Sequence, residues 1–142
     1  MHLIFKSYMN QTKGFTIDID VERKMCLVTG KGEISFEDST GAMNNLIADA
    51  RYNKNFPTIV DLRMIDYHPT YREFKGIRAQ LLFIRENFGN RVALITSGHL
   101  ASLGQLICFM VNKEGMKMKF FDKYEDGEKW ACEGKNQVLV SK

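Results

Sequence analysis

The chain has 142 residues, of which 44% are apolar and 26% are charged. This length indicates one domain over residues 1–142, large enough to bury a core without metal or disulfide cross-links. The 20 basic and 17 acidic side chains nearly balance and are spread along the chain, so there is no basic stripe for nucleic acid. We therefore expect no nucleic-acid partner.

Cysteine usage and the distribution of apolar residues bear on the compartment. The chain has three cysteines, Cys26, Cys108 and Cys132. Their odd number and the absence of a C-x-x-C pair favour reduced thiols in a cytosolic protein. No apolar run approaches the ~18 residues of a membrane span, and the first residues lack the apolar region of a signal peptide. We expect a cytoplasmic protein with no membrane span.

The first two elements are expected to be paired strands. Residues 1–14 form an N-terminal arm, which is either an extra strand or a loose end. Residues 15–22 alternate between apolar and polar, as in a strand with one buried and one exposed face, and Val21 falls on the buried side. A turn at residues 23–24 leads into a strand over residues 25–30, so the two strands should form an antiparallel hairpin.

The apolar period then lengthens to three or four residues, which indicates a helix. Ser35 and Asp38 form its start signal, and it should stop near residues 51–53. Its apolar stripe consists of Met43, Leu46, Ile47 and Ala50.

A central strand is predicted over residues 56–63, because β-branched and apolar residues follow Pro57, a residue tolerated at a strand start. The polar loop after it, residues 64–69, is where recognition or chemistry would be placed. Thr70 and Glu73 then form a capping box for a second helix. The apolar stripe of that helix consists of Phe74, Ile77, Leu81, Ile84 and Phe88.

The rest of the chain repeats the alternation of strand and helix. We expect strands at 92–96 and 117–121, with a third helix between them that ends at Gly115. A short helix carrying Trp130 follows, and residues 135–142 form a C-terminal tail. The stripe of the third helix consists of Leu100, Leu103, Ile107, Met110 and Val111.

This order predicts an α/β fold with a mostly parallel five-stranded sheet whose first strand is antiparallel. Strands separated by a helix should be parallel. Charged residues on one face of two strands, such as Asp61 with Arg63, favour helices crowded on one side of the sheet.

Several segments together resemble the bacterial STAS-like small proteins with the SpoIIAA-like fold. The resemblance lies in residues 49–57, 60–63, 90–95 and 120–125, ahead of Trp130, and its most specific part is R-Y…F-P…D-L-R. It covers residues 15–134. It implies a βα superhelix with a sequential, mostly parallel sheet. That fold is shared with anti-anti-sigma factors, cytoplasmic domains of anion transporters and CRAL-TRIO lipid-binding domains.

Regulatory members of that family carry a phosphorylatable serine in a D-S-x-G motif after the strand equivalent to residues 58–63. This chain has I-D-Y-H-P-T at residues 65–70 instead, so only Asp66 and the hydroxyl of Thr70 remain there. The resemblance therefore does not extend to that phosphorylation switch.

In open α/β sheets, ligands bind beyond the carboxyl ends of the strands. The candidate ligand or partner rim is therefore assigned to residues on the loops that follow the strands. These residues are Asp66, His68, Thr70, Ser97 and His99, with Tyr67 and Tyr71 nearby.

Each candidate also has a structural interpretation. Asp61 and Arg63 are a candidate charged pair, with Arg51 or Arg91 as a further candidate partner, because buried charges are usually paired. The capping box favours Thr70 as a helix cap over a phosphate acceptor. Two histidines and Asp66 would make three metal ligands, but the loop positions carry no metal spacing. We therefore expect surface histidines, no metal and no cofactor.

The third helix is apolar nearly all round, because Leu106, Cys108 and Phe109 lie outside its main stripe. It should be covered by the N-terminal arm, by residues 138–140, or by a second subunit. The last possibility implies a homodimer with Leu106, Phe109 and Met110 on the candidate dimer helix.

Three functions remain open. The first is a non-catalytic interaction or regulatory module with a protein partner. The second is a binder of a small apolar or lipid-like ligand, like CRAL-TRIO domains, with Phe109 and Met110 lining the pocket. The third is a small hydrolase or transferase using Asp66, His68 and Ser97, which would have to converge within hydrogen-bond reach.

Overall fold

The computed structural model describes the backbone of residues 9–140 and the side chains of residues 12–134, Ile84 excepted. The elements, in chain order, are β1 (Met9–Thr12), β2 (Phe15–Asp20), β3 (Met25–Glu33), α2 (Phe36–Ala48), β4 (Thr58–Asp66), α3 (Tyr71–Ile84), η1 (Arg85–Asn87), β5 (Val92–Ile95), η2 (Gly98–Leu100), α4 (Ala101–Asn112), β6 (Met118–Phe121) and α5 (Tyr124–Val140).

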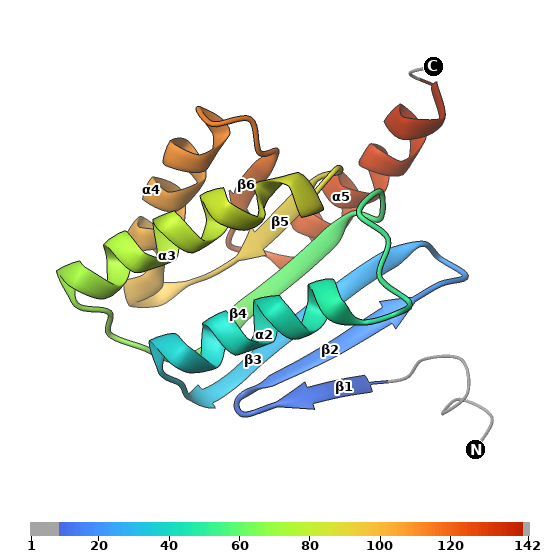
Figure 1. Cartoon of the computed structure of the whole chain (residues 1–142). Coiled ribbons are helices and arrows are strands. Elements are labelled where there is room, and N and C mark those ends of the chain that lie inside the picture. The colour runs from blue at the N-terminus through green and yellow to red at the C-terminus, as the bar shows by residue number, and fades with distance from the viewer. Residues whose placement is uncertain (1–8, 141–142) are drawn as a thin grey trace.

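The strands form one sheet in the order in which they follow along the chain (Figure 1). β1, β2 and β3 are antiparallel neighbours, whereas β3, β4, β5 and β6 are parallel. The five predicted strands are β2 to β6, so the mostly parallel α/β sheet is confirmed. β1 comes from the N-terminal arm and adds a sixth strand beside β2; residues 1–8 lie outside the described part.

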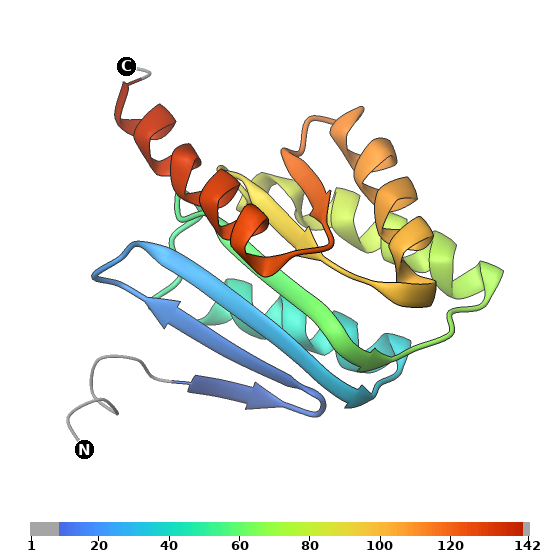
Figure 2. The ribbon, with the colours of Figure 1, turned by 180° about the vertical axis from the view of Figure 1, so that it is seen from behind.

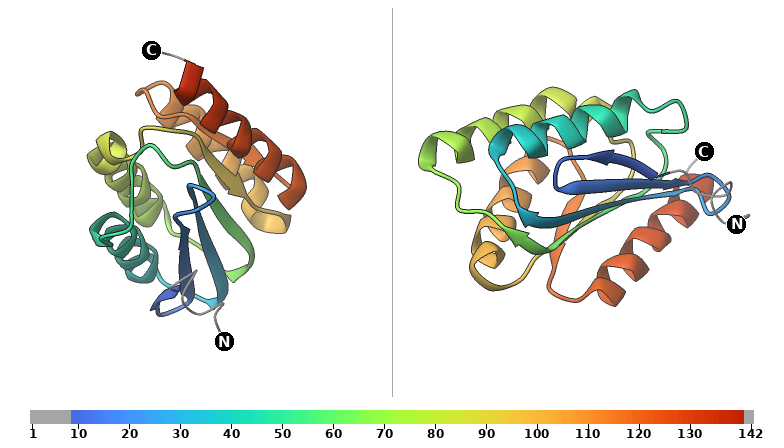
Figure 3. Two further views of the ribbon diagram at one scale, coloured as in Figure 1. Left: turned by 90° about the vertical axis from the view of Figure 1, so that its right-hand side faces the viewer. Right: turned by 90° about the horizontal axis from the view of Figure 1, so that it is seen from below.

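The helices are divided unequally between the two faces of the sheet. α2, α3 and α4 lie side by side on one face, and α5 lies alone on the other (Figures 1 and 2). The view from below in Figure 3 shows α2 and α3 on one side of the sheet and α5 on the other. The first face buries residues such as Ile17, Leu46 and Leu94, whereas α5 packs against Ile59, Ala93 and Ile95.

Local signals set the helix starts. Ser35 and Thr70 each accept a bond from the backbone N–H three residues later, and Asp38 and Glu73 each accept one in return. Both predicted capping boxes are therefore present. Each satisfies two backbone donors that the first helical turn leaves without a partner.

Several predicted boundaries were wrong. β2 ends at Asp20, so Val21 lies in the turn with 49% of its surface exposed. β4 extends into the predicted polar loop, because residues 64–66 continue to pair with β3 beyond a register shift. α5 is long and takes in most of the predicted tail. Gly134 is buried within α5, where a side chain would collide with Asn90 and Arg91.

Candidate functional site

The carboxyl edge of the sheet brings two separate loops together. β4 runs to Asp66, well beyond the last residue of its parallel neighbour β5. The chain after β5 turns at Gly98, whose φ of 63° is a left-handed conformation that glycine adopts without strain. This turn places His99 beside the extended end of β4.

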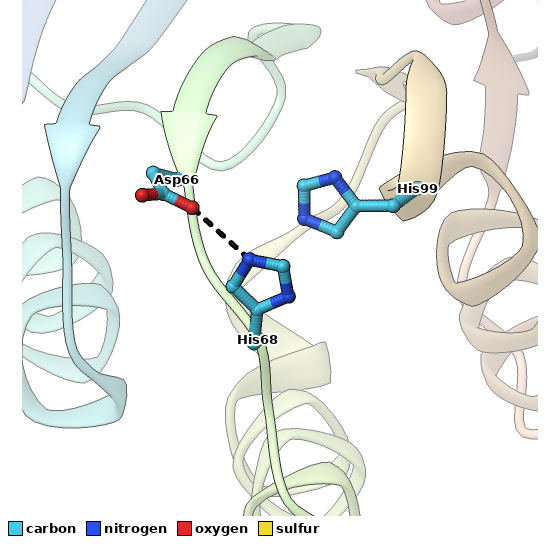
Figure 4. A group of neighbouring side chains, drawn as sticks. All are labelled: Asp66, His68 and His99. Atoms are coloured by element: carbon cyan, nitrogen blue, oxygen red, sulfur yellow. Dashed lines mark ion pairs between the residues drawn. The ribbon is translucent and has the colours of Figure 1, made fainter.

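Asp66, His68 and His99 form a cluster at this edge (Figure 4). His68 Nε2 lies 3.2 Å from Asp66 Oδ1. The two imidazole rings are stacked, with centroids 4.5 Å apart and planes inclined by 15°. One possible ligand atom from each of the three side chains lies within 4.8 Å of the other two, and all three residues are exposed.

Buried anchors fix the loop that carries His68. The Tyr67 side chain is only 8% exposed and packs in the core. Its hydroxyl donates to Glu73 Oε1 at 3.3 Å, and burial, together with the neighbouring carboxylates Glu73 and Glu37, raises the pKa of Tyr67 to about 12. The Tyr67 backbone carbonyl faces outward, 2.9 Å from His99 Nε2.

The remaining predicted rim residues, Thr70 and Ser97, form no side-chain hydrogen bond with this cluster among the described residues. Thr70 is the N-cap of α3, and its hydroxyl accepts from the Glu73 backbone N–H at 3.1 Å. Ser97 is exposed and makes no side-chain capping bond. Among the described residues, no hydrogen bond joins Ser97 to His68 or His99.

Asp61 and Arg63 form an ion pair on the face of the sheet that α5 only partly covers. Arg63 donates to both carboxylate oxygens of Asp61 at 2.9 Å. Burial alone would raise the pKa of Asp61, but the hydrogen bonds and charge of Arg63 outweigh it and lower that pKa. The Arg63 guanidinium also lies over the Tyr124 ring. The pair is thus structurally satisfied without a ligand.

The two arginines suggested as sharing this pair have partners elsewhere. Arg51 Nη2 lies 2.7 Å from Asp49 Oδ2. Arg91 donates to the Trp130 carbonyl at 2.8 Å and lies 3.5 Å from a carboxylate oxygen of Glu133.

A second candidate site is a cavity of about 150 Å³ between the sheet and α2, α3 and α4. Its lining is almost wholly apolar, and from α4 it includes Leu103, Gly104 and Ile107. Phe109 and Met110, predicted to line such a pocket, do not line it. The buried hydroxyl of Thr96 reaches this cavity without a hydrogen-bond partner among the described atoms.

From the sequence, both histidines and Asp66 were expected on one rim and were weighed as three metal ligands, but surface histidines without a metal were predicted because the positions carry no metal spacing. Asp66 ends β4 and His68 lies two residues later in the following loop, and an Asp-x-His pair is too short a pattern to indicate a metal. The available signal was topological: the loops after two neighbouring parallel strands meet at one edge.

Comparisons with known proteins bear on the fold alone. No protein-family model and no curated protein matches the chain. Among solved structures, an uncharacterized protein of the DUF3478 family with a SpoIIAA-like fold, from Shewanella loihica PV-4, is similar with a TM-score of 0.53. The two chains are 18% identical, and the match covers 89% of this chain and 92% of the other. The chain therefore has a SpoIIAA-like fold.

Among the described helices, none combines the length and the apolar character needed to cross a bilayer.

Proposed function

We propose that the protein is a non-catalytic interaction module of the STAS-like type, which acts in the cytoplasm and pairs with a second copy of itself. The observation that carries this proposal is the outer face of α4. Leu106 and Phe109 lie one turn apart there and are 47% and 61% exposed, and Met110 beside them is half-buried. We call these three residues the α4 patch.

The chain leaves the α4 patch uncovered within the described residues. The opposite face of α4 is buried through residues such as Ile107 and Val111, so the helix is already anchored to its own sheet. Residues 138–140, one predicted cover, continue α5 on the other side of the sheet (Figure 2).

The charge of α4 favours a second copy as the occupant. No charged residue occurs between Ala101 and Asn112. The nearest charge to the patch is the Lys113 ammonium, which lies 4.8 Å from the centroid of the Phe109 ring and would stand at the rim of such an interface. A two-fold interface places the same surface on both subunits, which an uncharged apolar patch satisfies. Phe109 is an aromatic side chain of the kind that contributes strongly to interface cores.

The hydrolase or transferase hypothesis has less support. Asp66 and His68 are close, but Ser97 has no hydrogen bond to either histidine among the described contacts. A serine nucleophile requires a base within hydrogen-bond reach. Pairing through the α4 patch needs no such constellation.

Sedimentation velocity over a wide range of protein concentration tests the pairing. We expect a monomer–dimer equilibrium, and a Leu106→Ser, Phe109→Ser variant should raise the dimer dissociation constant at least tenfold. The matched control is Phe83→Ser on α3, because Phe83 is 82% exposed yet lies outside the patch. A wild-type chain that stays monomeric at high concentration would contradict the proposal, as would equal effects of the two changes.

The 150 Å³ cavity favours binding of a small apolar ligand as a second candidate function. The volume is below the roughly 300 Å³ of typical small-molecule pockets, so it suits a short apolar group better than a whole lipid. Native mass spectrometry of freshly purified protein should then show a bound mass. A spectrum containing only the bare chain, together with no thermal stabilisation by benzene, would count against this candidate.

A further inference from the structure

We propose that Asp66, His68 and His99 bind one divalent transition-metal ion, with Zn²⁺ as the representative. The carboxylate comes from the last residue of β4, and the two imidazoles come from the loop after β4 and from η2. The proposal concerns the carboxyl edge of the sheet and does not depend on pairing through the α4 patch.

The donor set determines the class of ion. Imidazole nitrogen suits Zn²⁺, Ni²⁺, Cu²⁺ and Fe²⁺, whereas Mg²⁺ and Ca²⁺ prefer oxygen ligands alone. Two histidines with one carboxylate leave coordination positions for water or a further ligand. We therefore expect the site to select first-row transition ions over Mg²⁺.

The distances are within reach of coordination. Zinc bonds of about 2.0–2.2 Å place tetrahedral ligand atoms roughly 3.4 Å apart. His68 Nε2 and Asp66 Oδ1 already lie 3.2 Å apart, and the widest pair in the cluster is within 4.8 Å. Since all three side chains are exposed, rotation about their χ angles can close the remaining gap without moving the core.

The Tyr67 carbonyl, 2.9 Å from His99 Nε2, adds a second observation. If Nε2 carries the ring proton, it donates to this carbonyl, and the ring must turn before Nδ1, which faces away from Asp66 and His68 in Figure 4, can offer its lone pair to the ion. A backbone carbonyl is a usual partner for the second nitrogen of a metal-bound histidine. If Nε2 is unprotonated, the carbonyl oxygen stands next to it as a further oxygen ligand. The buried Tyr67 ring holds this carbonyl in place in both cases.

The stacking of the His68 and His99 rings predicts a change in ring orientation when a metal ion binds. Metal ions lie near the plane of the imidazole that binds them, and planes inclined by only 15° with centroids 4.5 Å apart cannot both contain one ion. At least one ring must therefore turn when the ion binds. The stack in Figure 4 should be lost, and the ring signals of both histidines should shift in NMR spectra.

Isothermal titration calorimetry of the untagged, metal-free chain with Zn²⁺ alone tests the site. We expect one ion per chain and no detectable binding of Mg²⁺. His68→Ala and His99→Ala should each weaken Zn²⁺ binding at least tenfold, and Asp66→Asn should weaken it to a smaller extent. Circular dichroism checks folding, which these exposed residues should not affect.

The third histidine, His2, provides a matched control. His2→Ala should leave Zn²⁺ affinity unchanged and NMR shifts should be confined to His68 and His99. Absence of binding at millimolar Zn²⁺ would overturn the proposal. So would loss of binding in His2→Ala with retention in His68→Ala, or a thiolate absorption band with Co²⁺, which would assign the ion to a cysteine. The Leu106→Ser, Phe109→Ser variant should still bind Zn²⁺, so failure of pairing and failure of the metal site can be told apart.

Discussion

The two faces of the sheet are packed in different ways. Under α2, α3 and α4 the core contains a cavity of about 150 Å³. Under α5 the contact is so close that a side chain at Gly127 would collide with Ile95. Further along that second face, α5 no longer covers the strands, and the sheet carries the Asp61–Arg63 pair and half-buried polar residues such as Thr16 and Thr29.

This difference indicates where the molecule can tolerate change. The three-helix face has unused volume, so added atoms can enter it, whereas protein interiors packed to normal density resist even one methylene. The α5 face depends on small residues at the contact, Gly127 and Ala93, which set the distance between helix and sheet.

Thiol chemistry should show the largest contrast. Burial raises the pKa of both Cys26 and Cys108 to about 12 from 9.0, so their reactive thiolate fraction falls about a thousandfold. Both lie under the three-helix layer, whereas Cys132 is half-buried on α5. With Ellman's reagent at neutral pH, we expect at most one fast thiol per native chain and three after denaturation. A second fast thiol would show that the three-helix layer opens to reagent.

A pair of neighbouring substitutions in β5 compares the two faces directly. Val92 lines the cavity, and the next residue, Ala93, faces α5. Ala93→Val should reduce the free energy of unfolding by about 1–3 kcal/mol because it overpacks the α5 contact. Val92→Ile adds one methylene on the cavity side and should be neutral or stabilise by up to about 0.8 kcal/mol. Urea denaturation measures both, and equal losses would mean that the cavity is not available to side chains.

The parts of this architecture that the sequence predicted are those set by local rules. Ser35 and Thr70 cap helices through residues three positions away, and the alternation in β2 requires only its own side chains. Val21 was misplaced because the turn, and not the alternation, decides where β2 ends. β1 depends on pairing with β2, and the close approach of α5 at Gly134 to Asn90 depends on packing, neither of which a pattern along the chain expresses.

The candidate site was predicted only in part for a similar reason. The rim residues were predicted on loops, whereas Asp66 is the last residue of β4 and His99 lies in η2. The proximity of His68 and His99 depends on how far β4 extends beyond the end of β5 and on the turn at Gly98. Those are properties of register and backbone direction. The ion pair of Asp61 and Arg63 was accessible to sequence reasoning because residues two apart in a strand share a face.

The last prediction concerns that ion pair on the partly covered face. Asp61→Asn should lower the free energy of unfolding by about 1–2 kcal/mol at neutral pH, since it removes a charged acceptor from Arg63. The pKa of Asp61 is lower in the folded chain than its unfolded value of about 3.9, so its stabilisation is present above that pH. It is lost as the pH falls through the lower folded pKa.

The difference in the free energy of unfolding between Asp61→Asn and the wild type should therefore have its full size at pH 5–7 and become smaller below about pH 4. Urea denaturation at several pH values measures it, and Asp66→Asn serves as the control. Asp66 is exposed, and its replacement should change stability by less than about 0.5 kcal/mol. If Asp61→Asn lowered the free energy of unfolding as much at pH 3 as at neutral pH, the contribution of Asp61 to stability would come from the packing of its side chain and not from its charge.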